Sequence, residues 1–329
     1  MHRLQRCGWQ AELASAITEP AELLTALGLP AQLLEDLEPA SRDFRLRVPR
    51  SFVQRMQPGD PDDPLLRQVL PRAEENLPVS GYVADPVGDL DAMTVPGLLH
   101  KYHGRALLVT TGACGVHCRY CFRRHFPYSE ANPAQTDWQP ALDYLAADTS
   151  LREIILSGGD PLMLSDNRLA GLVERLEAIP HLQRLRLHTR LPVVLPARVD
   201  SALTDWLSRT RLQSIIVLHI NHPNELDPSL SAACERLRAS GSALLNQSVL
   251  LKGINDRAET LVALSERLFA AGIQPYYLHQ LDPVAGAAHF AINDEQAGDL
   301  LAAMREQLSG YLVPKLVREQ AGKPAKTPV

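Results

Sequence analysis

Residues 106–122 read ALLVTTGACGVHCRYCF, an apolar run followed at once by three closely spaced cysteines. The run Ala106–Thr110 is short, rich in aliphatic residues and followed by Thr-Gly, which predicts a buried strand. Cys114, Cys118 and Cys121 come directly after it. The sequence therefore predicts a metal-binding loop at the end of a strand.

The spacing of the three cysteines favours an iron-sulfur cluster. Three thiolates hold a four-iron, four-sulfur (4Fe-4S) cluster by three corners and leave one iron without a protein ligand. The other two cysteines, Cys7 and Cys234, belong to no second cluster motif. A structural zinc ion is the alternative, because His117 or His125 would supply the fourth ligand that zinc requires.

Outward from this loop, strand-like and helix-like stretches alternate six times, which is typical of βα units. The predicted strands are Ala106–Thr110, Glu153–Ser157, Arg184–His188, Ser214–His219, Ala243–Leu251 and Ile273–Leu281. The predicted helices are Trp138–Ala147, Arg168–Ile179, Ser201–Arg209, Leu230–Ser240, Arg257–Ala271 and Asp294–Leu308. Right-handed crossovers curl such a sheet into an α/β partial barrel, here (β/α)6, with its catalytic groups at the carboxyl ends of the strands.

The two ends of the chain differ from this pattern. Residues 1–95 predict a mainly helical extension, with helical stretches at Ala21–Leu27 and Ala31–Leu37, and residues 96–329 form the barrel and its tail. The tail after Tyr311 is rich in Lys, Gly and Pro. By composition alone it predicts a frayed terminus.

Composition excludes several classes of protein. The 329 residues are 45% hydrophobic with a formal net charge of −5, which gives no electrostatic case for non-specific binding to nucleic acid. No stretch resembles a membrane span or a signal peptide. Clustered cysteines favour metal binding in a reducing compartment, so we expect a cytoplasmic protein with no membrane partner.

A glycine-rich turn follows the second predicted strand. Ser157, Gly158, Gly159 and Asp160 form either an ordinary βα turn or a turn whose backbone approaches a ligand closely. Arginines stand on both sides of the cysteine loop, at positions 105, 123 and 124. They are either solvated or serve to bind carboxylate and phosphate groups.

Several motifs together resemble known enzymes. The pattern Cys-x3-Cys-x2-Cys resembles the signature of radical S-adenosylmethionine (SAM) enzymes. Further stretches resemble the lysine 2,3-aminomutase family, namely 102–105 (YHGR), 156–162 (LSGGDPL), 188–192 (HTRLP), 221–225 (NHPNE), 246–251 (NQSVLL) and 309–314 (SGYLVP). Residues 46–52 (LRVPRSF) and 59–70 (GDPDDPLLRQVL) resemble the branch that makes β-lysine for modifying elongation factor P.

The resemblance implies three cofactors: a 4Fe-4S cluster on the three cysteines, SAM, and pyridoxal 5′-phosphate (PLP). It implies that PLP is joined to Lys326, with Lys323 as the rival, because the family's PLP lysine lies in a segment ending Lys-x-Pro-Val. Arg105 matches the ligand of the PLP phosphate, and Arg123 matches the ligand of the substrate carboxylate.

Further implied contacts are less direct. The turn from Ser157 to Asp160 matches the motif that holds the SAM amino group, and Gln247 and Tyr277 align with residues near SAM and PLP. The family holds the substrate ε-ammonium with two aspartates. Glu319 occupies one of these positions, and the other falls near Gln280, with Asp282 two residues further on.

The function implied by the resemblance is conversion of (S)-α-lysine to (R)-β-lysine by a 5′-deoxyadenosyl radical and PLP. The implied partners are lysine, an electron donor of the flavodoxin or ferredoxin type, and elongation factor P with its β-lysine ligase. Two alternatives remain, an aminomutase for another amino acid or pathway and a non-catalytic iron-sulfur interaction protein. The anionic side chain of Glu319 favours a substrate with a cationic side chain.

Overall fold

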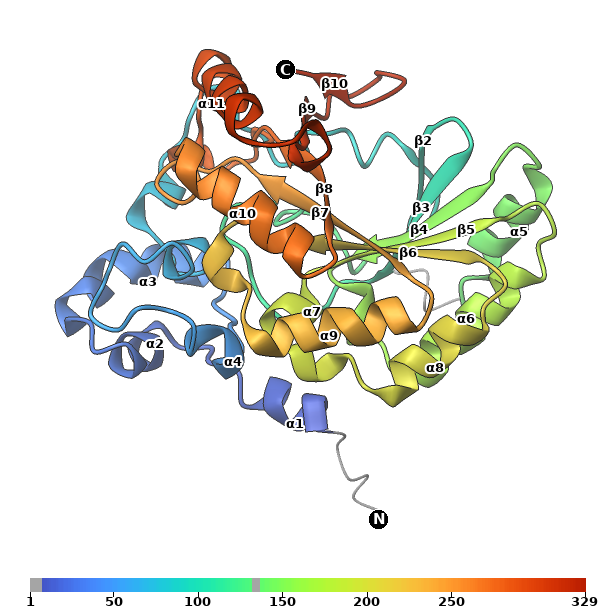
Figure 1. Ribbon diagram of the computed structural model, residues 1–329, viewed down its shortest axis with the longest axis horizontal. Coiled ribbons are helices and arrows are strands. Elements are labelled where there is room, and N and C mark those ends of the chain that lie inside the picture. The colour runs from blue at the N-terminus through green and yellow to red at the C-terminus, as the bar shows by residue number, and fades with distance from the viewer. Residues whose placement is uncertain (1–7, 132–136) are drawn as a thin grey trace.

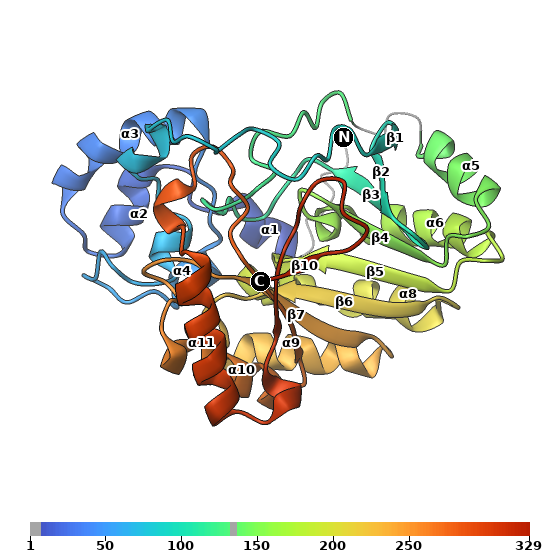
Figure 2. The same cartoon turned by 90° about the horizontal axis from the view of Figure 1, so that it is seen from above.

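A single curved sheet of ten strands organises the chain. The computed structural model describes residues 8–131 and 137–329, so Cys7 lies outside the described residues. The strands follow one another across the sheet in sequence order (Figures 1 and 2). They are β1 Met93–Val95, β2 Leu98–Tyr102, β3 Arg105–Thr111, β4 Glu153–Gly158, β5 Arg184–Thr189, β6 Gln213–His219, β7 Ala243–Val249, β8 Gln274–His279, β9 Lys315–Arg318 and β10 Thr327–Pro328.

Strands β3 to β9 are parallel, while β1, β2 and β10 pair antiparallel at the two edges. All six predicted strands and the partial α/β barrel are confirmed. The predictions missed β9, which adds a seventh parallel strand, and the three short edge strands. Each is no longer than five residues, too short for a clear periodic signal.

Long helices cover the outer side of the sheet (Figure 2). They are α5 Gln139–Ala147, α6 Asp166–Glu177, α8 Ser201–Arg209, α9 Pro228–Ala239, α10 Ala258–Ala270 and α11 Asp294–Gln307, with a short α7 at Leu191–Val194. Each of the six longer helices matches a predicted one. None of the helices in the described ranges is long and apolar enough to cross a bilayer.

Local sequence signals fix where these helices begin and end. The carboxylates of Asp200 and Asp227 accept the backbone N–H groups of the first turns of α8 and α9, at 3.1 and 2.8 Å. Gly241 and Gly272, each two residues past a helix, have φ of +89° and +74°. Only glycine adopts this left-handed conformation readily, so both helices end in the turn that returns the chain to the sheet.

The N-terminal segment carries four helices within residues 8–53, followed by two short 3-10 turns, and packs against the barrel. Its helices are α1 Gly8–Ala14, α2 Pro20–Ala26, α3 Leu34–Asp43 and α4 Arg50–Val53 (Figure 1). Phe52 and Leu66 belong to the same apolar cluster as Leu162 and Leu187 of the barrel. Burial of apolar surface therefore attaches this segment to the barrel.

The prediction of a frayed C-terminus is wrong. After β9, the chain turns back and β10 pairs antiparallel with it, Thr327 opposite Arg318 and Pro328 opposite Val317. The backbone N–H of Val329 donates to Leu316 at 3.3 Å. Composition did not reveal this pairing, because it depends on a partner strand that the tail meets only after folding.

Candidate active site

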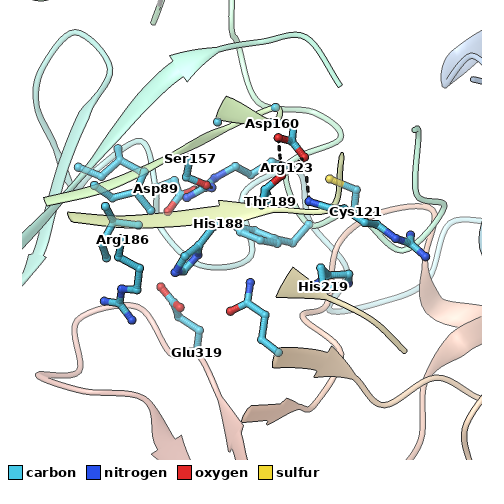
Figure 3. Close-up of a pocket in the computed structure, with 18 of the residues that line it drawn as sticks. Asp89, Cys121, Arg123, Ser157, Asp160, Arg186, His188, Thr189, His219 and Glu319 are labelled. Carbon is cyan, nitrogen blue, oxygen red and sulfur yellow. Dashed lines mark hydrogen bonds and ion pairs between the residues drawn. The ribbon is translucent and has the colours of Figure 1, made fainter. Parts of the chain in front are cut away.

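The curved sheet encloses a cavity of about 940 Å³ (Figure 3). Its lining extends from Arg105 and Arg184, the first residues of β3 and β5, to the loops beyond the carboxyl ends of the strands. The cavity is large enough for a cofactor together with a substrate. Most of the residues with an expected role line it: Arg105, Cys114, Cys118, Cys121, Arg123, Ser157, Gly158, Gly159, Asp160, Gln247, Tyr277, Asp282, Glu319 and Lys326. Segments more than 200 residues apart in the sequence thus meet in one place.

The three cysteines occupy one end of this cavity. Burial and the charges of the other two thiols raise the pKa of Cys114, and burial followed by the charge of Cys118 raises the pKa of Cys121 to about 11. Three neighbouring thiolates therefore need bound cations to balance their charge. This donor set fits an iron-sulfur cluster, whose iron ions supply that charge.

Each of the two histidines that could act as a fourth zinc ligand already has one ring nitrogen near a backbone carbonyl. His117 Nδ1 is 2.8 Å from the carbonyl oxygen of Arg45, and His125 Nε2 is 3.0 Å from that of Ala285. Within residues 8–131 and 137–329, no three His, Cys, Asp or Glu side chains converge on a site for a single metal ion.

The glycine turn packs directly against the cysteine loop. Gly159 donates its N–H to the carbonyl of Thr111 at 2.7 Å, and a Cβ at Gly159 would lie 2.3 Å from the carbonyl oxygen of Ala113. The turn needs glycine here because two backbones touch. A contact of this turn with SAM stays a prediction.

Asp160 supports the same region through its carboxylate. Its oxygens accept the Thr189 hydroxyl at 2.7 Å and the backbone N–H groups of Arg190 and Leu191 at 2.8 and 2.9 Å (Figure 3). This side chain therefore joins the ends of β4 and β5.

The opposite end of the cavity holds Lys326. Its Nζ lies 2.8 Å from Glu319 Oε2 and 5.7 Å from the centre of the Tyr277 ring. Lys323, the rival, is exposed and does not line the cavity. Arg105 also faces this region, with its guanidinium 4.4 Å from the centre of the Tyr102 ring.

Polar atoms without partners fit this end to an anionic ligand such as PLP. Arg186 Nε and His188 Nε2 are buried and make no hydrogen bond to the described residues. Burial, followed by the charge of Arg186, lowers the pKa of His188 well below its usual value. Both side chains point into the cavity from alternate positions of β5 (Figure 3).

A chain of ion pairs crosses the cavity wall. Arg123 Nε donates to Asp89 at 2.6 Å, and Lys101 Nζ lies 2.5 Å from the other oxygen of Asp89. Lys101 also contacts Glu319 at 3.1 Å, and Glu319 holds Lys326. Five buried or partly buried charges of alternating sign thus connect the cluster end to the lysine end.

The pKa values of the two carboxyl groups beside Lys326 differ sharply. Burial alone would raise the pKa of Glu319, but Lys326 and Lys101 outweigh it and lower this pKa to about 2. Burial, and then the charge of Glu319, raise the pKa of Asp282 to about 7. Gln280 does not line the cavity, and its side-chain amide donates to the backbone carbonyl of Ile292. Asp282 lines the cavity, so it is the second carboxyl group near Lys326.

Four charged or polar residues of the cavity were not predicted from the sequence: Asp89, Lys101, Arg186 and His188. Buried parallel strands usually read as continuous apolar runs, whereas β5 reads Arg-Leu-Arg-Leu-His-Thr with its polar residues at alternate positions. This alternation was the available signal for Arg186 and His188. Asp89 and Lys101 gave none, because their contacts arise only in the folded chain.

Known proteins resemble this chain closely. A family model described as "4Fe-4S single cluster domain" matches residues 103–185. The L-lysine 2,3-aminomutase of Escherichia coli is 52% identical over 98% of this chain and 94% of its own length. That of Haemophilus influenzae is 50% identical over 97% and 94%, and that of Clostridium subterminale is 33% identical over 98% and 77%. Among solved structures, a radical SAM methyltransferase from Sphaerobacter thermophilus is 19% identical, with a TM-score of 0.46 over 67% of this chain and 68% of its own.

Proposed function

The chain belongs to the lysine 2,3-aminomutase family, and on that premise we propose that it converts (S)-α-lysine into (R)-β-lysine. The observation that carries the proposal is the single cavity that joins three cysteines to a lysine and two carboxyl groups. When bound, the reduced cluster with SAM supplies a 5′-deoxyadenosyl radical, and PLP supplies a conjugated ring that delocalises an unpaired electron.

Lys326 and Arg105 are the residues that hold PLP in this proposal. Lys326 approaches the cavity from β10 beside the Tyr277 ring, and Arg105 offers a guanidinium for the phosphate. Gln247 and Tyr277 line the space between the two ends of the cavity. We assign them contacts with SAM and PLP.

Arg123 binds the substrate carboxylate. Its Nε is already held by Asp89, and NH1 makes only a 3.3 Å hydrogen bond to the hydroxyl of Ser157. Asp89 therefore fixes the plane of the guanidinium, and the terminal nitrogens remain for a bidentate contact. The turn of Ser157, Gly158 and Gly159 beside it takes the amino group of SAM.

Glu319 and Asp282 recognise the substrate ε-ammonium. The Lys326 ammonium already lies 2.8 Å from Glu319, so this end of the cavity accommodates the ammonium group of a lysine side chain. Because Lys326 would hold PLP in this proposal, Glu319 would be the residue that holds the substrate ammonium. Two carboxyl groups here favour a cationic substrate over another amino acid.

We further propose that the protein is cytoplasmic, receives electrons from a flavodoxin or ferredoxin, and supplies β-lysine to the ligase that modifies elongation factor P. The support is the resemblance of residues 46–52 and 59–70 to the branch with that role. A non-catalytic iron-sulfur protein would leave the carboxylate and lysine end of the cavity without a use.

Reconstitution without oxygen tests the cofactor assignment. We expect about four iron and four sulfide per chain, and a change in the electron paramagnetic resonance (EPR) spectrum of the reduced cluster when SAM binds the open iron. Cys118→Ala should lose both signals. Stoichiometric zinc without sulfide in protein purified anaerobically would contradict the proposal.

A further inference from the structure

Arg190 makes a direct contact with one of the cluster cysteines. It follows β5 immediately, and its side chain is only 6% exposed. NH1 of its guanidinium donates to Cys118 Sγ at 2.8 Å. The resemblance to known enzymes gave this arginine no role.

The surrounding residues fix the guanidinium in this orientation. NH1 also donates to the Tyr120 hydroxyl at 2.6 Å, and NH2 donates to Gln68 at 2.6 Å and to Glu225 at 3.0 Å. The backbone N–H of Arg190 is held by Asp160 at 2.8 Å. Because protein groups hold it from several sides, the contact with sulfur needs no ligand to form.

Glu225 is itself held in place, which makes the whole arrangement rigid. Its other oxygen accepts the backbone N–H groups of Asn221 and His222 at 2.8 and 3.0 Å. The side chain of Glu225 is fully buried. The ion pair with Arg190 is therefore shielded from water. Charges interact more strongly in the protein interior than at its surface.

A cation that donates a hydrogen bond to a ligand sulfur has a defined effect on an iron-sulfur cluster. One-electron reduction makes the cluster more negative, and both the positive charge and the hydrogen bond stabilise the more negative state. We propose that Arg190 is a positioning residue that acts through Cys118 to raise the reduction potential of the cluster. One electron passes from a low-potential donor to the cluster, and no bond breaks in this step.

The inference about Arg190 rests on the 4Fe-4S cluster of the proposed function. The experiment distinguishes a failure of this inference from a failure of the proposed function. Wild-type protein that binds no such cluster would contradict the proposed function. A cluster that assembles but does not respond to Arg190 would contradict only this inference.

The test is a redox titration monitored by EPR, without SAM, on the reconstituted full-length protein. At one fixed applied potential we expect Arg190→Gln to lower the ratio of reduced to oxidised cluster at least tenfold. For a one-electron couple, a tenfold change corresponds to a decrease of about 59 mV in the reduction potential. Arg190→Lys keeps the charge and should lie between Arg190→Gln and the wild type. A full cluster with the wild-type ratio in Arg190→Gln overturns the proposal.

Arg184→Gln is the matched control. It removes the same charge from the same cavity, but Arg184, on β5, pairs with Glu153 and not with a cysteine. We expect its ratio to stay within threefold of the wild type. Equal shifts in the two Gln variants would overturn the proposal, because the hydrogen bond would then have no special effect.

Two further measurements complete the test. If Arg190→Gln shifts the ratio only when SAM is present, the guanidinium acts on SAM and the proposal is wrong. Wild-type protein labelled with ¹⁵N in its arginine side chains should show nitrogen coupling to the reduced cluster. Its absence would overturn the proposal even if the variants do not fold.

Discussion

Glu319 and Asp282 are two carboxyl groups in one cavity whose charge states differ. Glu319 is paired with Lys101 and Lys326 and stays ionised, whereas Asp282, buried beside that negative charge, holds its proton near neutral pH. Under the proposed function, substrate selection at the residue scale depends on how much of the ε-ammonium contact each carboxyl group carries.

The first prediction concerns this division. Glu319→Gln removes a partly buried negative charge, which costs about 2–4 kcal/mol, because the ammonium group is left without its ionic partner. We expect a loss of roughly 30- to 1000-fold in kcat/KM for lysine. Asp282→Asn should cost less, and the double variant measures their coupling. A kcat/KM for lysine within threefold of the wild-type value in Glu319→Gln would rule out the role assigned to Glu319.

The second prediction follows from the pKa of Asp282, which burial and Glu319 raise to about 7. Below that pH the carboxyl group is protonated and does not pair with the ε-ammonium. We expect kcat/KM for lysine to decrease as the pH falls through about 7 and to level off at the value of Asp282→Asn, because a protonated Asp282 is as neutral as the asparagine. Asp282→Asn should lose this limb of the profile. An unchanged limb in that variant would assign the titration to another group.

At the scale of elements, the tail from β9 to β10 brings the lysine into the cavity. Strand β9 extends the parallel sheet beside β8, and β10 folds back on β9 so that Lys326 faces Glu319 seven residues earlier. The register of this small antiparallel pair decides which lysine reaches PLP. A one-residue shift would turn Lys326 to the other face.

The third prediction uses the two lysines of this tail. Lys326→Ala should lose the absorption of protein-bound PLP while keeping the iron-sulfur cluster, since the cysteines lie on a different loop. Lys323→Ala is the matched control and should keep both, because Lys323 is exposed. Absorption spectra of the two reconstituted variants check this. The opposite result would show that β10 pairs in another register.

Elements with a strong local signal were predictable from the sequence. The pattern of apolar residues predicts helix α10 and strand β6. The spacing of the cysteines from Cys114 to Cys121 predicts the metal-binding loop. Strand β10 did not, because Thr327–Pro328 is only two residues long and is defined by its partner. The contact of Lys101 with Glu319 likewise joins residues 218 positions apart, which no local pattern encodes.

At the scale of the whole molecule, a buried charge cluster ties the N-terminal segment to the cysteine loop. Glu75 pairs with Arg119 at 2.5 Å and with Arg124 at 2.8 Å, and both guanidinium groups lie near the Phe44 ring, at 4.9 and 4.6 Å from its centre. All three charged side chains are nearly inaccessible to water. The N-terminal segment thus fixes two residues of the loop that carries the cluster ligands.

The fourth prediction tests this connection. Glu75→Gln leaves two buried cations without their shared partner, so we expect a loss of about 3–5 kcal/mol in the free energy of unfolding. Denaturant unfolding of the cofactor-free protein measures it. Glu74→Gln, next to it but exposed, is the control and should change stability by less than about 0.5 kcal/mol. Equal stabilities for the two variants would contradict the account.

The most direct test of the central claim is whether the reconstituted protein rearranges lysine. Protein loaded anaerobically with iron, sulfide and PLP is incubated with (S)-lysine, SAM and dithionite, and the products are separated and identified by mass spectrometry. We predict that β-lysine forms and that none forms with Lys326→Ala or without SAM. Protein carrying a full cluster and bound PLP that leaves lysine unchanged would contradict the account.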